Sequence, residues 1–480
     1  PIVIFSIFQR AVFTTPVAIL CLISRNSIHR LSLMLRPSLD HSLVVSKNCV
    51  KLQDKFAAHT LWTFVERSGR HIRQSRTLQS ILIKMMNMFS NIFKGPTVHS
   101  PVVAMSARLA STEATFQAKP FKLHKLDSGP EVNMHVTKED ALRYYTQMQT
   151  IRRMETAAGN LYKEKKVRGF CHLYSGQEAC AVGMKAAMEP GDAAITAYRC
   201  HGWTYLSGSS VAKVLCELTG RLTGNVYGKG GSMHMYGENF YGGNGIVGAQ
   251  QPLGTGIAFA MKYKKQKNVC ITLFGDGATN QGQLYESMNM AKLWELPVLY
   301  VCENNGYGMG TSAARSSAST DYYTRGDYVP GFWVDGMDVL AVREAIRWAK
   351  EWCNAGKGPL MIEMATYRYG GHSMSDPGTS YRTREEIQEV RKTRDPITGF
   401  KDKIVTAGLV TEDELKEVDK EIRKEVDAAV KQAHTDKESP VEMLLTDIYF
   451  NTPAQYVRCT TENVLQQYVT SEDAFKALSK

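Results

Sequence analysis

Two polar stretches of the sequence could bind a divalent cation together with a phosphate. Asp276 lies in a Gly-Asp-Gly triplet directly after residues 269–274, an unbroken apolar run typical of a buried parallel strand. Asn305 follows a second such run, residues 298–302. Because neighbouring parallel strands end at one edge of a sheet, Asp276, Asn305 and the backbone carbonyl of Tyr307 should meet there. A carboxylate, an amide oxygen and a carbonyl suit Mg²⁺, which also takes phosphate oxygens.

The segment between the two strands should supply a helix that points at the bound phosphate. Residues 281–295 are rich in helix formers, and Pro297 closes them. A helix beginning after Gly277 would offer free N–H groups and a positive dipole end to a diphosphate. A Gly-Asp-Gly triplet alone is usually a turn, but between two such strands and before Asn-Asn it resembles the thiamine-diphosphate motif of transketolases, decarboxylases and 2-oxo-acid dehydrogenases.

A second glycine-rich stretch, residues 243–248, has the Gly-x-Gly-x-x-Gly spacing of a dinucleotide-binding fingerprint. That fingerprint needs a strand directly before it and an acidic residue about 20 positions later. Here residues 238–242 read as a loop, and Asp276 already has the metal role. We therefore interpret these glycines as allowing close backbone approach to a flat or phosphorylated ligand, not to NAD.

The charge of the chain is concentrated at its N-terminal end. The 480 residues carry a net charge of +11, and residues 1–110 alone hold 14 Lys and Arg against three Asp and Glu. Residues 111–480 are balanced, so a nucleic-acid-binding arm would rest on the N-terminal segment alone. No run approaches the roughly 20 apolar residues of a membrane span. The ten cysteines form no Cys-x-x-Cys pair, which favours a reducing compartment.

The N-terminal 110 residues are predicted to be a disordered extension. Residues 1–84 show no sustained helical or strand period. Residues 67–112 contain no acidic residue but several Arg, Lys, Ser and Thr, a composition typical of an organellar transit peptide, which we place at about 85–110. Few aromatic residues interleave the charges, which disfavours nucleic-acid binding.

The rest of the chain is predicted to be an α/β protein with a mostly parallel sheet flanked by helices. Folded structure is expected to begin near Thr137, as the capping box of a helix, and Ser209 is expected to cap a second helix. We assign residues 111–384 to an α/β domain that binds the cofactor and metal. Residues 385–480 are predicted to form a helical region and arm packed on the same unit.

Several motifs in one order resemble the alpha subunits of mitochondrial pyruvate dehydrogenases, the thiamine-dependent first component of that complex. The likeness runs from about Thr115 to Val457 and implies the thiamine-diphosphate-binding fold. The motifs are Gly169-Phe170-Cys171-His172-Leu173, Ala197-Tyr198-Arg199-Cys200-His201-Gly202, Lys229-Gly230-Gly231-Ser232-Met233-His234-Met235-Tyr236, the loop at 243–248 and Gly371-His372-Ser373-Met374-Ser375-Asp376-Pro377.

The resemblance assigns roles to individual residues. It implies that Mg²⁺ is held by Asp276, Asn305 and the carbonyl of Tyr307. The residues that it implies for binding thiamine diphosphate are Tyr198, Arg199, Gly245, Val247, Asp276, Gly277, Ala278, Asn305, Tyr307 and His372. The residues that it implies for catalysis are His172, near the reacting thiazolium carbon, and His372, near the diphosphate. The roles of His201 and His234 stay open.

The same resemblance implies an incomplete active site and a set of partners. The aminopyrimidine ring of thiamine diphosphate needs a carboxylate to tune it and a second α/β domain to hold it, and neither is recognisable in this sequence. In that family a beta subunit supplies both, within an α₂β₂ heterotetramer. Lipoyl domains of dihydrolipoyl acetyltransferase would accept the acetyl group in the mitochondrial matrix. The implied targets of pyruvate dehydrogenase kinase and phosphatase are Ser312, Ser373 and Ser380.

Other functions fit parts of the sequence. The alpha subunit of branched-chain 2-oxo-acid dehydrogenase shares the metal motif, but residues 229–236 and 371–377 favour pyruvate. A catalytically silent regulatory paralogue is disfavoured by the intact Asp276, Asn305 and His172.

Four positions depart from the family pattern without touching the metal ligands. Gly370 replaces a His, Gly306 replaces a larger basic residue, Gly237 takes the place of an Ala, and Ala314 stands where an acidic residue is usual. Loop ordering and the response to a kinase are the properties that they would affect.

Overall fold

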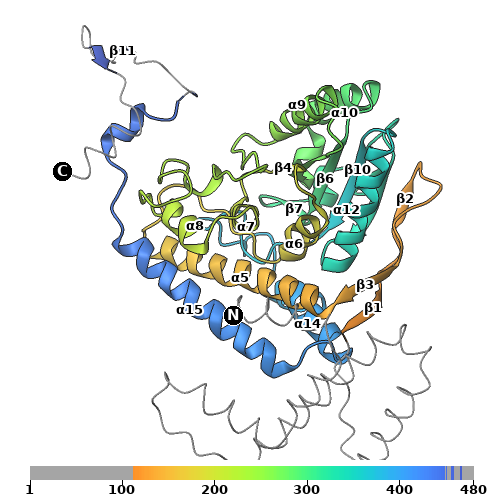
Figure 1. Cartoon of the computed structure of the whole chain (residues 1–480), viewed down its shortest axis with the longest axis horizontal. Helices are drawn as coiled ribbons and strands as arrows, with labels where there is room; N and C mark the ends of the chain where they lie inside the picture. The colour runs from red at the N-terminus through yellow and green to blue at the C-terminus, as the bar shows by residue number, and fades with distance from the viewer. Residues whose placement is uncertain (1–111, 449, 451–455, 459–464, 468–480) are drawn as a thin grey trace, which may run out of the picture. The chain divides into compact units, whose positions relative to one another are not determined.

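A six-stranded sheet forms the centre of the computed structural model, which describes residues 112–448, 450, 456–458 and 465–467. Five neighbouring strands are parallel, and the edge strand β2 is antiparallel to β9 (Figure 1). In spatial order the strands are β2 (Lys122–His124), β9 (Gly331–Asp335), β10 (Leu360–Ala365), β6 (Val298–Asn304), β5 (Cys270–Gly275) and β4 (Ala193–Ile195). The predicted α/β class with a mainly parallel sheet is confirmed.

The register of the central strands brings three strand ends to one edge. Gly275 of β5 pairs with Glu303 of β6, and Asn304 of β6 pairs with Ala365 of β10. Residues that follow β5, β6 and β10 therefore leave the sheet side by side. This is the carboxyl edge at which open parallel sheets bind ligands.

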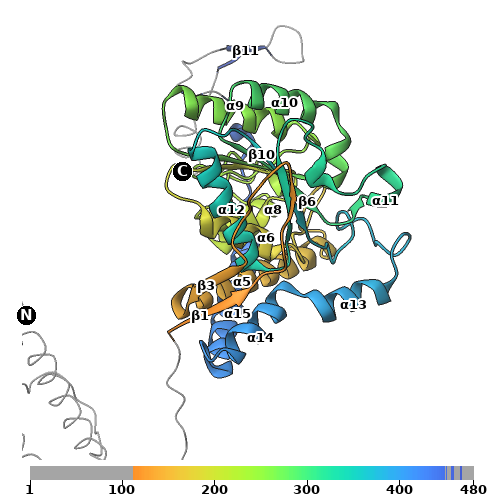
Figure 2. The ribbon, with the colours of Figure 1, turned by 90° about the vertical axis from the view of Figure 1, so that its right-hand side faces the viewer.

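Helices cover both faces of the sheet, as the turned view in Figure 2 shows. The helices α9 (Gln250–Tyr263) and α10 (Gly282–Leu293) pack on one face. The helices α5 (Lys138–Lys163), α6 (Glu178–Ala187) and α12 (Val339–Asn354) pack on the other. Each strand can serve both layers because successive side chains point to opposite faces of the sheet.

Strand β6 shows this alternation directly. Leu299 and Val301 join the core beneath α5, α6 and α12. Val298, Tyr300 and Cys302 join the core beneath α9 and α10. A strand buried on both faces needs apolar residues throughout, which explains the unbroken runs in the sequence.

The remaining elements surround this three-layer unit. Its other helices are α7 (His201–Leu206), α8 (Val211–Leu218), α11 (Ala313–Ser316), α13 (Arg384–Arg394), α14 (Pro396–Thr406) and α15 (Glu412–Thr435). The short strands outside the sheet are β1 (Glu113–Gln117), β3 (Asn133–Thr137), β7 (Tyr307–Gly308), β8 (Thr311–Ser312), β11 (Tyr456–Arg458) and β12 (Leu465–Gln467). Its 3₁₀ helices are η3 (Gly231–Met233), η4 (Asp276–Asn280), η5 (Tyr322–Thr324) and η6 (Val441–Leu445).

The long helix α15 packs along α5. Asp419 Oδ1 accepts hydrogen bonds from Tyr145 Oη at 3.2 Å and from Gln149 Nε2 at 3.0 Å. Lys138 Nζ forms an ion pair of 2.6 Å with Glu414, where both helices begin. The boundary predicted at residue 384 stays a prediction.

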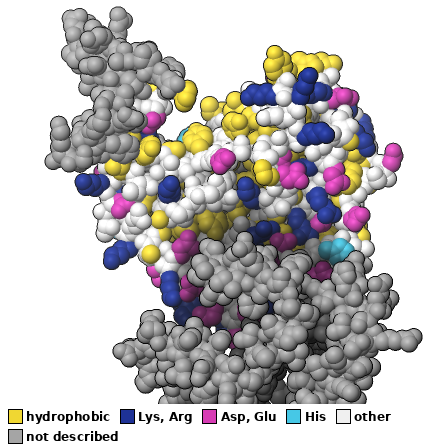
Figure 3. Space-filling view, in the orientation of Figure 1, with side chains coloured by type: hydrophobic (Ala, Val, Ile, Leu, Met, Phe, Trp, Pro, Cys, Tyr) yellow, Lys and Arg dark blue, Asp and Glu magenta, His cyan; other side chains and the backbone are white. Residues whose placement is uncertain are grey.

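Exposed apolar side chains gather over the outer surface of α9 and α10 (Figure 3). Phe259, Tyr263 and Trp294 form a cluster of rings, with centroids 6.3 Å apart for the first pair and 5.6 Å apart for Phe259 and Trp294. No helix in the described part of the chain is long and apolar enough to cross a membrane.

The predicted start of folded structure near Thr137 is wrong. β1 pairs antiparallel with β3, and β2 joins the central sheet, so three strands precede α5. These strands are short and half exposed, and they lack the apolar runs that mark the central strands. Thr137 is the N-cap of α5, and its Oγ1 accepts from Asp140 N–H at 3.2 Å. The disordered extension and transit peptide predicted within residues 1–110 lie outside the described residues.

Two further helix predictions need correction. Ser210, not Ser209, caps α8 and accepts from Lys213 N–H at 3.2 Å, while Ser209 Oγ accepts from Asn225. The expected α-helix after Gly277 is a five-residue 3₁₀ helix, η4, and α10 begins only at Gly282. Thr279 Oγ1 donates to the carbonyl of Asp276, which closes this tight turn.

Candidate active site

Asp276 is a buried carboxylate at the carboxyl edge of the sheet. Its side chain is 1% exposed, and its Oδ2 has no hydrogen-bond partner among the described residues. Burial raises the pKa of Asp276 to about 6, although its own backbone N–H, Arg368 and the N–H of Asn305 favour the charged form. A buried oxygen without a partner is costly. The Oδ2 atom of Asp276 is therefore suited to bind a cation.

The other two predicted metal ligands lie beside Asp276. The Oδ1 atom of Asn305 accepts from Tyr307 N–H at 3.3 Å, and its Nδ2 donates to Gln177 Oε1 at 3.2 Å. A Cβ atom built on Gly277 would lie 3.7 Å from the Cα of Gly308, so the Asp276 turn touches β7. Among the described residues, no group of three or more His, Cys, Asp or Glu side chains is arranged to hold a metal ion. One carboxylate with neutral oxygens fits Mg²⁺ that is also bound to phosphate.

Two buried guanidinium groups lie in this region: Arg368 acts on the Asp276 carboxylate, and Arg199 lies near Arg368. Arg199 Nη1 donates to the carbonyl of Leu173 at 2.5 Å, and its Nη2 donates to the carbonyl of His372 at 2.9 Å. Arg368 donates to the carbonyls of Tyr307 and Met309, each at 3.3 Å. Burial and the charge of Arg199 lower the pKa of Arg368 to about 10. Neither group has an ion-pair partner in the described part of the chain, so both can neutralise an anion.

The structure brings His172, Tyr198 and His372 into one cluster of rings. The centroid of His172 lies 4.4 Å from that of Tyr198 and 5.3 Å from that of His372. Tyr198 and His372 are 5.4 Å apart, and the guanidinium of Arg199 lies 5.6 Å from the centre of the Tyr198 ring. His172, Tyr198, Arg199 and His372 come from three separate motifs of the predicted site. The structure makes them neighbours.

Both histidines are held in the neutral form. Burial, followed by Arg199 and His372, lowers the pKa of His172 to about 3. Burial, followed by Arg199 and Arg368, lowers the pKa of His372 to about 4. The Nδ1 atom of each ring has no partner among the described residues. At neutral pH each ring can therefore accept or donate a hydrogen bond toward a ligand.

The lowered pKa of His172 predicts a specific loss of stability in acid. The unfolded chain binds a proton near pH 6.5 and the folded chain only near pH 3, so stability present above pH 6.5 falls as the pH drops through this window. From pH 6.5 to 5 the loss from this ring should be about 2 kcal/mol. Thermal unfolding of the native assembly at both pH values should show a smaller decrease for His172→Asn. An equal decrease would contradict the assignment.

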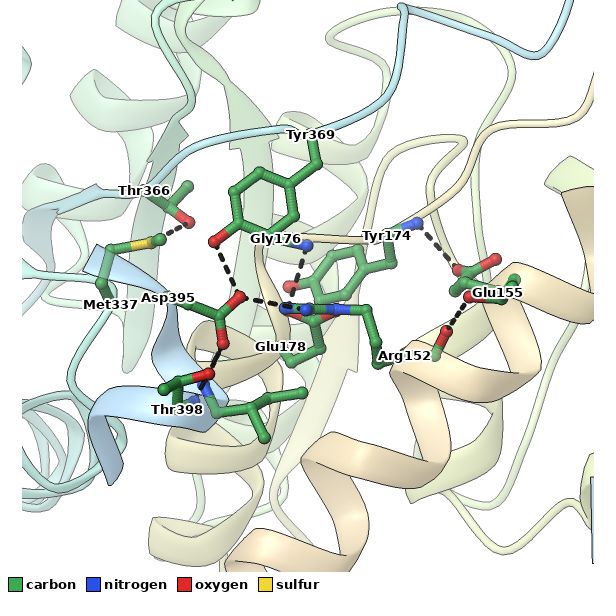
Figure 4. A network of polar contacts seen from close by, with 12 residues as sticks. Arg152, Glu155, Tyr174, Gly176, Glu178, Met337, Thr366, Tyr369, Asp395 and Thr398 are labelled. Carbon is green, nitrogen blue, oxygen red and sulfur yellow. Dashed lines mark hydrogen bonds and ion pairs between the residues drawn. The ribbon is translucent and has the colours of Figure 1, made fainter. Parts of the chain in front are cut away.

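The base of the loop that carries His372 is anchored by a buried network (Figure 4). Arg152 on α5 forms a two-pronged ion pair with Glu178 on α6, with Nη2 to Oε2 at 2.9 Å, and donates to Asp395 at 3.0 Å. Tyr369 Oη donates to the same Asp395 oxygen at 2.9 Å. Asp395 also caps α14 by accepting from the N–H of Thr398 at 2.9 Å.

The predicted glycine-loop residues lie at the rim of the site. Val247 is 43% exposed, and the side chain nearest to Gly245 is His234. Ala278 is buried in the core under α9, and its carbonyl accepts from Gln251 Nε2 at 3.3 Å. Any contact of Ala278 with a cofactor would therefore use its backbone. Gly277 is exposed at the turn.

The three predicted phosphorylation sites differ in exposure. Ser373 is 6% exposed, and its hydroxyl lies 2.8 Å from that of Ser375. Ser380 is exposed, and Ser312 is half-buried at the start of α11. Asp376 closes the loop between Ser373 and Ser380 by accepting from His372 N–H at 2.6 Å.

The glycines that depart from the family pattern differ in how much room surrounds them. Gly306 has φ +86°, a left-handed conformation that suits glycine. A Cβ on Gly237 would lie 2.8 Å from Ser207 Cβ, so even alanine would crowd this position. A Cβ on Gly370 would meet no atom within 4 Å, and Ala314 is exposed.

Sequence reasoning missed three residues of the site. Arg368 and Gln177 contact the predicted metal ligands, and Glu303 is a buried acid whose pKa is raised to about 7 by burial. Arg368 follows strand β10, so the reasoning on strand ends that identified Asp276 could have found it. Gln177 precedes a helix and carries no comparable signal.

The sequence model of the dehydrogenase E1 component family matches residues 146–442, which include the parallel strands and every site residue described above. The fold and site thus define a thiamine-diphosphate-dependent dehydrogenase E1 component. Three relatives agree across most of the chain. The chain is 97% identical over 391 residues to the type II pyruvate dehydrogenase E1 component subunit alpha, mitochondrial, of Ascaris suum, covering 82% of this chain and 100% of the relative.

Two more distant relatives carry the same kind of name. The chain is 70% identical over 397 residues to a probable mitochondrial pyruvate dehydrogenase E1 component subunit alpha of Caenorhabditis elegans, covering 82% of this chain and 100% of the relative. It is 56% identical over 377 residues to the somatic form of the mitochondrial pyruvate dehydrogenase E1 component subunit alpha of Homo sapiens, covering 78% of this chain and 96% of the relative. The chain belongs to the family of mitochondrial pyruvate dehydrogenase E1 alpha subunits.

Proposed function

We propose that this chain acts in the mitochondrial matrix as the alpha subunit of pyruvate dehydrogenase. The reaction is the oxidative decarboxylation of pyruvate with transfer of the acetyl group to lipoyl groups. The observation that carries the proposal is the Oδ2 atom of Asp276, which has no partner among the described residues and lies near Asn305 and the guanidinium of Arg368, with that of Arg199 close to Arg368. This combination of one anionic oxygen and two cations suits a metal diphosphate.

The residues divide the work of binding and orientation. Asp276, Asn305 and the carbonyl of Tyr307 would hold Mg²⁺, and Arg199 and Arg368 would neutralise the diphosphate. The neutral rings of His172 and His372 are placed to exchange hydrogen bonds or protons near the substrate. When bound, thiamine diphosphate supplies the electron sink for decarboxylation.

We propose a beta subunit as the partner that completes this site in an α₂β₂ heterotetramer. Large apolar side chains surround the histidines and the glycine loop without cover, including Phe170 at 60% and Ile246 at 74% exposure. The ring of Phe170 lies 5.8 Å from that of His172. Contiguous exposed apolar surface at a site is typical of an interface. Lipoyl domains of dihydrolipoyl acetyltransferase would then reach the completed site.

The proposed function is tested by co-expressing the chain with a beta subunit. We expect Mg²⁺-dependent release of carbon dioxide from pyruvate, and none from the isolated chain. Branched-chain 2-oxo acids should be much poorer substrates. Faster release from branched acids, or activity without the beta subunit, would contradict the proposal.

Phosphorylation by pyruvate dehydrogenase kinase, reversed by the phosphatase, is proposed at Ser312, Ser373 and Ser380. A charge at Ser373 would lie next to His372 and repel a bound diphosphate, so Ser373→Glu should lower activity at least about tenfold. Ser380→Glu should have a smaller effect because Ser380 is exposed. Steady-state rates of the two variants check this. A larger loss for Ser380→Glu would reverse the expected order.

A further inference from the structure

Three side chains from separate elements form a buried chain of hydrogen bonds behind His172. Glu155 lies on α5, His201 begins α7 and Ser232 lies in η3. The Nδ1 atom of His201 lies 2.8 Å from Glu155 Oε2, and its Nε2 lies 2.9 Å from Ser232 Oγ. Glu155 and His201 are 0% exposed and Ser232 is 4% exposed. No role assigned so far uses these three residues.

The order of acid, imidazole and hydroxyl is that of a nucleophilic triad, but the contacts of Ser232 exclude that role. Its hydroxyl oxygen accepts from the backbone N–H of His172 at 3.2 Å. With a carboxylate on Nδ1, the hydroxyl of Ser232 donates to His201 Nε2. The hydroxyl is therefore engaged on both sides and buried from any substrate.

The same hydrogen-bonded group fixes the backbone N–H groups of two residues, His172 and Tyr174. His172 N–H donates to Ser232, and Tyr174 N–H donates to Glu155 Oε1 at 2.8 Å (Figure 4). Between them, the carbonyl of Leu173 accepts from Arg199 at 2.5 Å. A segment held at every residue by buried polar groups can keep the His172 ring at a defined position.

The loop that precedes Ser232 is held by a further buried carboxylate, that of Glu217. Glu217 on α8 is 0% exposed and accepts four backbone N–H groups of the loop before Ser232. Two of these belong to Gly230 at 2.7 Å and Gly231 at 3.1 Å, directly before Ser232. The hydroxyl therefore rests on a loop that a buried carboxylate holds in place.

We propose that Glu155, His201 and Ser232 form a positioning relay that holds the backbone N–H groups of His172 and Tyr174, so that the imidazole of His172 meets the reacting atoms. The inference rests on the proposed function for the role of His172. These residues act through His172 and touch no substrate. Misplacement of a reacting group by about 1 Å can cost two orders of magnitude in rate.

The test uses the alpha–beta heterotetramer and the variants Ser232→Ala and Ser287→Ala. Ser287 is the control because it is a buried serine on α10 whose hydroxyl donates only within its helix, to Gln283 at 2.6 Å. Ser232→Ala should lower kcat about 10- to 100-fold with little change in KM, and Ser287→Ala should leave both unchanged. In a His172→Asn background, Ser232→Ala should lower kcat less than about twofold, because the relay acts through that ring.

A conservative variant and an activity-independent measurement complete the test. Glu155→Gln keeps an oxygen that accepts from Tyr174 N–H. Its amide nitrogen can donate to His201 Nδ1, and His201 Nε2 can then donate to Ser232. Glu155→Gln should therefore retain far more activity than Glu155→Ala. Amide hydrogen exchange of the peptide covering 170–176 should speed up about tenfold or more in Ser232→Ala and not in Ser287→Ala. The relay would be overturned if Ser232→Ala left the amide hydrogen exchange of residues 170–176 unchanged. It would also be overturned if Ser232→Ala lowered kcat equally in the wild-type and His172→Asn backgrounds. A wild-type heterotetramer inactive on pyruvate but with the expected exchange would refute only the proposed function.

Discussion

Asp276→Asn is expected to lower Mg²⁺-dependent pyruvate decarboxylation about 1,000-fold or more while leaving the fold intact. The substitution removes the negative charge that would hold the metal, and metal-assisted stabilisation of charge is worth several kcal/mol. The same change should leave thermal stability unchanged or raise it, because it replaces an acid that burial already disfavours in its charged form. Initial rates across a Mg²⁺ titration, with melting curves of the cofactor-free complex, measure both.

The matched control for Asp276 is an acid on the same carboxyl edge of the sheet. Asp335 is the last residue of β9 and forms ion pairs with Lys119 and Arg394, the second at 3.2 Å. Asp335→Asn should therefore lower stability and keep Mg²⁺-dependent turnover, the reverse of the Asp276 pattern. Wild-type turnover in Asp276→Asn at low Mg²⁺ would remove the basis of the metal site.

Arg152→Met is expected to destabilise the subunit by about 3–5 kcal/mol. The change leaves the buried carboxylates of Glu178 and Asp395 without their shared cation, and these side chains are 0% and 5% exposed. Breaking a buried pair by removing one partner leaves an uncompensated charge. Methionine keeps most of the side-chain volume, so loss of packing contributes little. Thermal unfolding of the heterotetramer, together with the soluble yield, measures the effect.

Lys420→Met is the control for Arg152. Lys420 pairs with Glu417 at 3.2 Å on α15, but the two side chains are 60% and 69% exposed, so this exposed pair should contribute nothing measurable. If Arg152→Met is as stable as Lys420→Met, the network in Figure 4 does not anchor the histidine loop. Restoring stability with the additional change Glu178→Gln would support charge imbalance as the cause.

The metal-binding edge could be predicted from the sequence because its signals are local. The apolar runs before Asp276 and Asn305 identify two buried parallel strands, and topology then brings their ends together without any knowledge of side-chain contacts. The structure places both residues at the carboxyl edge of β5 and β6. Their role as Mg²⁺ ligands, like the other site roles, stays a prediction.

Contacts between distant segments could not be predicted in the same way. Arg152 and Asp395 are 243 positions apart, and nothing in the pattern of either segment indicates the partner. The role of His201 stayed open in the sequence, and its contacts with Glu155 and Ser232 are seen only once three elements have folded together. The short strand β2 was missed because it has one paired neighbour and too few apolar residues to show a period.

Helix α5 carries Arg152 and Glu155 three positions apart, so one turn of one helix supports both histidine-bearing segments. Arg152 holds the base of the loop that carries His372, and Glu155 holds the extended segment that carries His172. A slight rotation of this helix would shift both segments together, although Ser232 also holds His172 and Asp376 also holds His372. Substitutions on the inward face of α5 should therefore displace the rings of both His172 and His372. Substitutions within residues 371–381 should displace the ring of His372 and leave that of His172 in place.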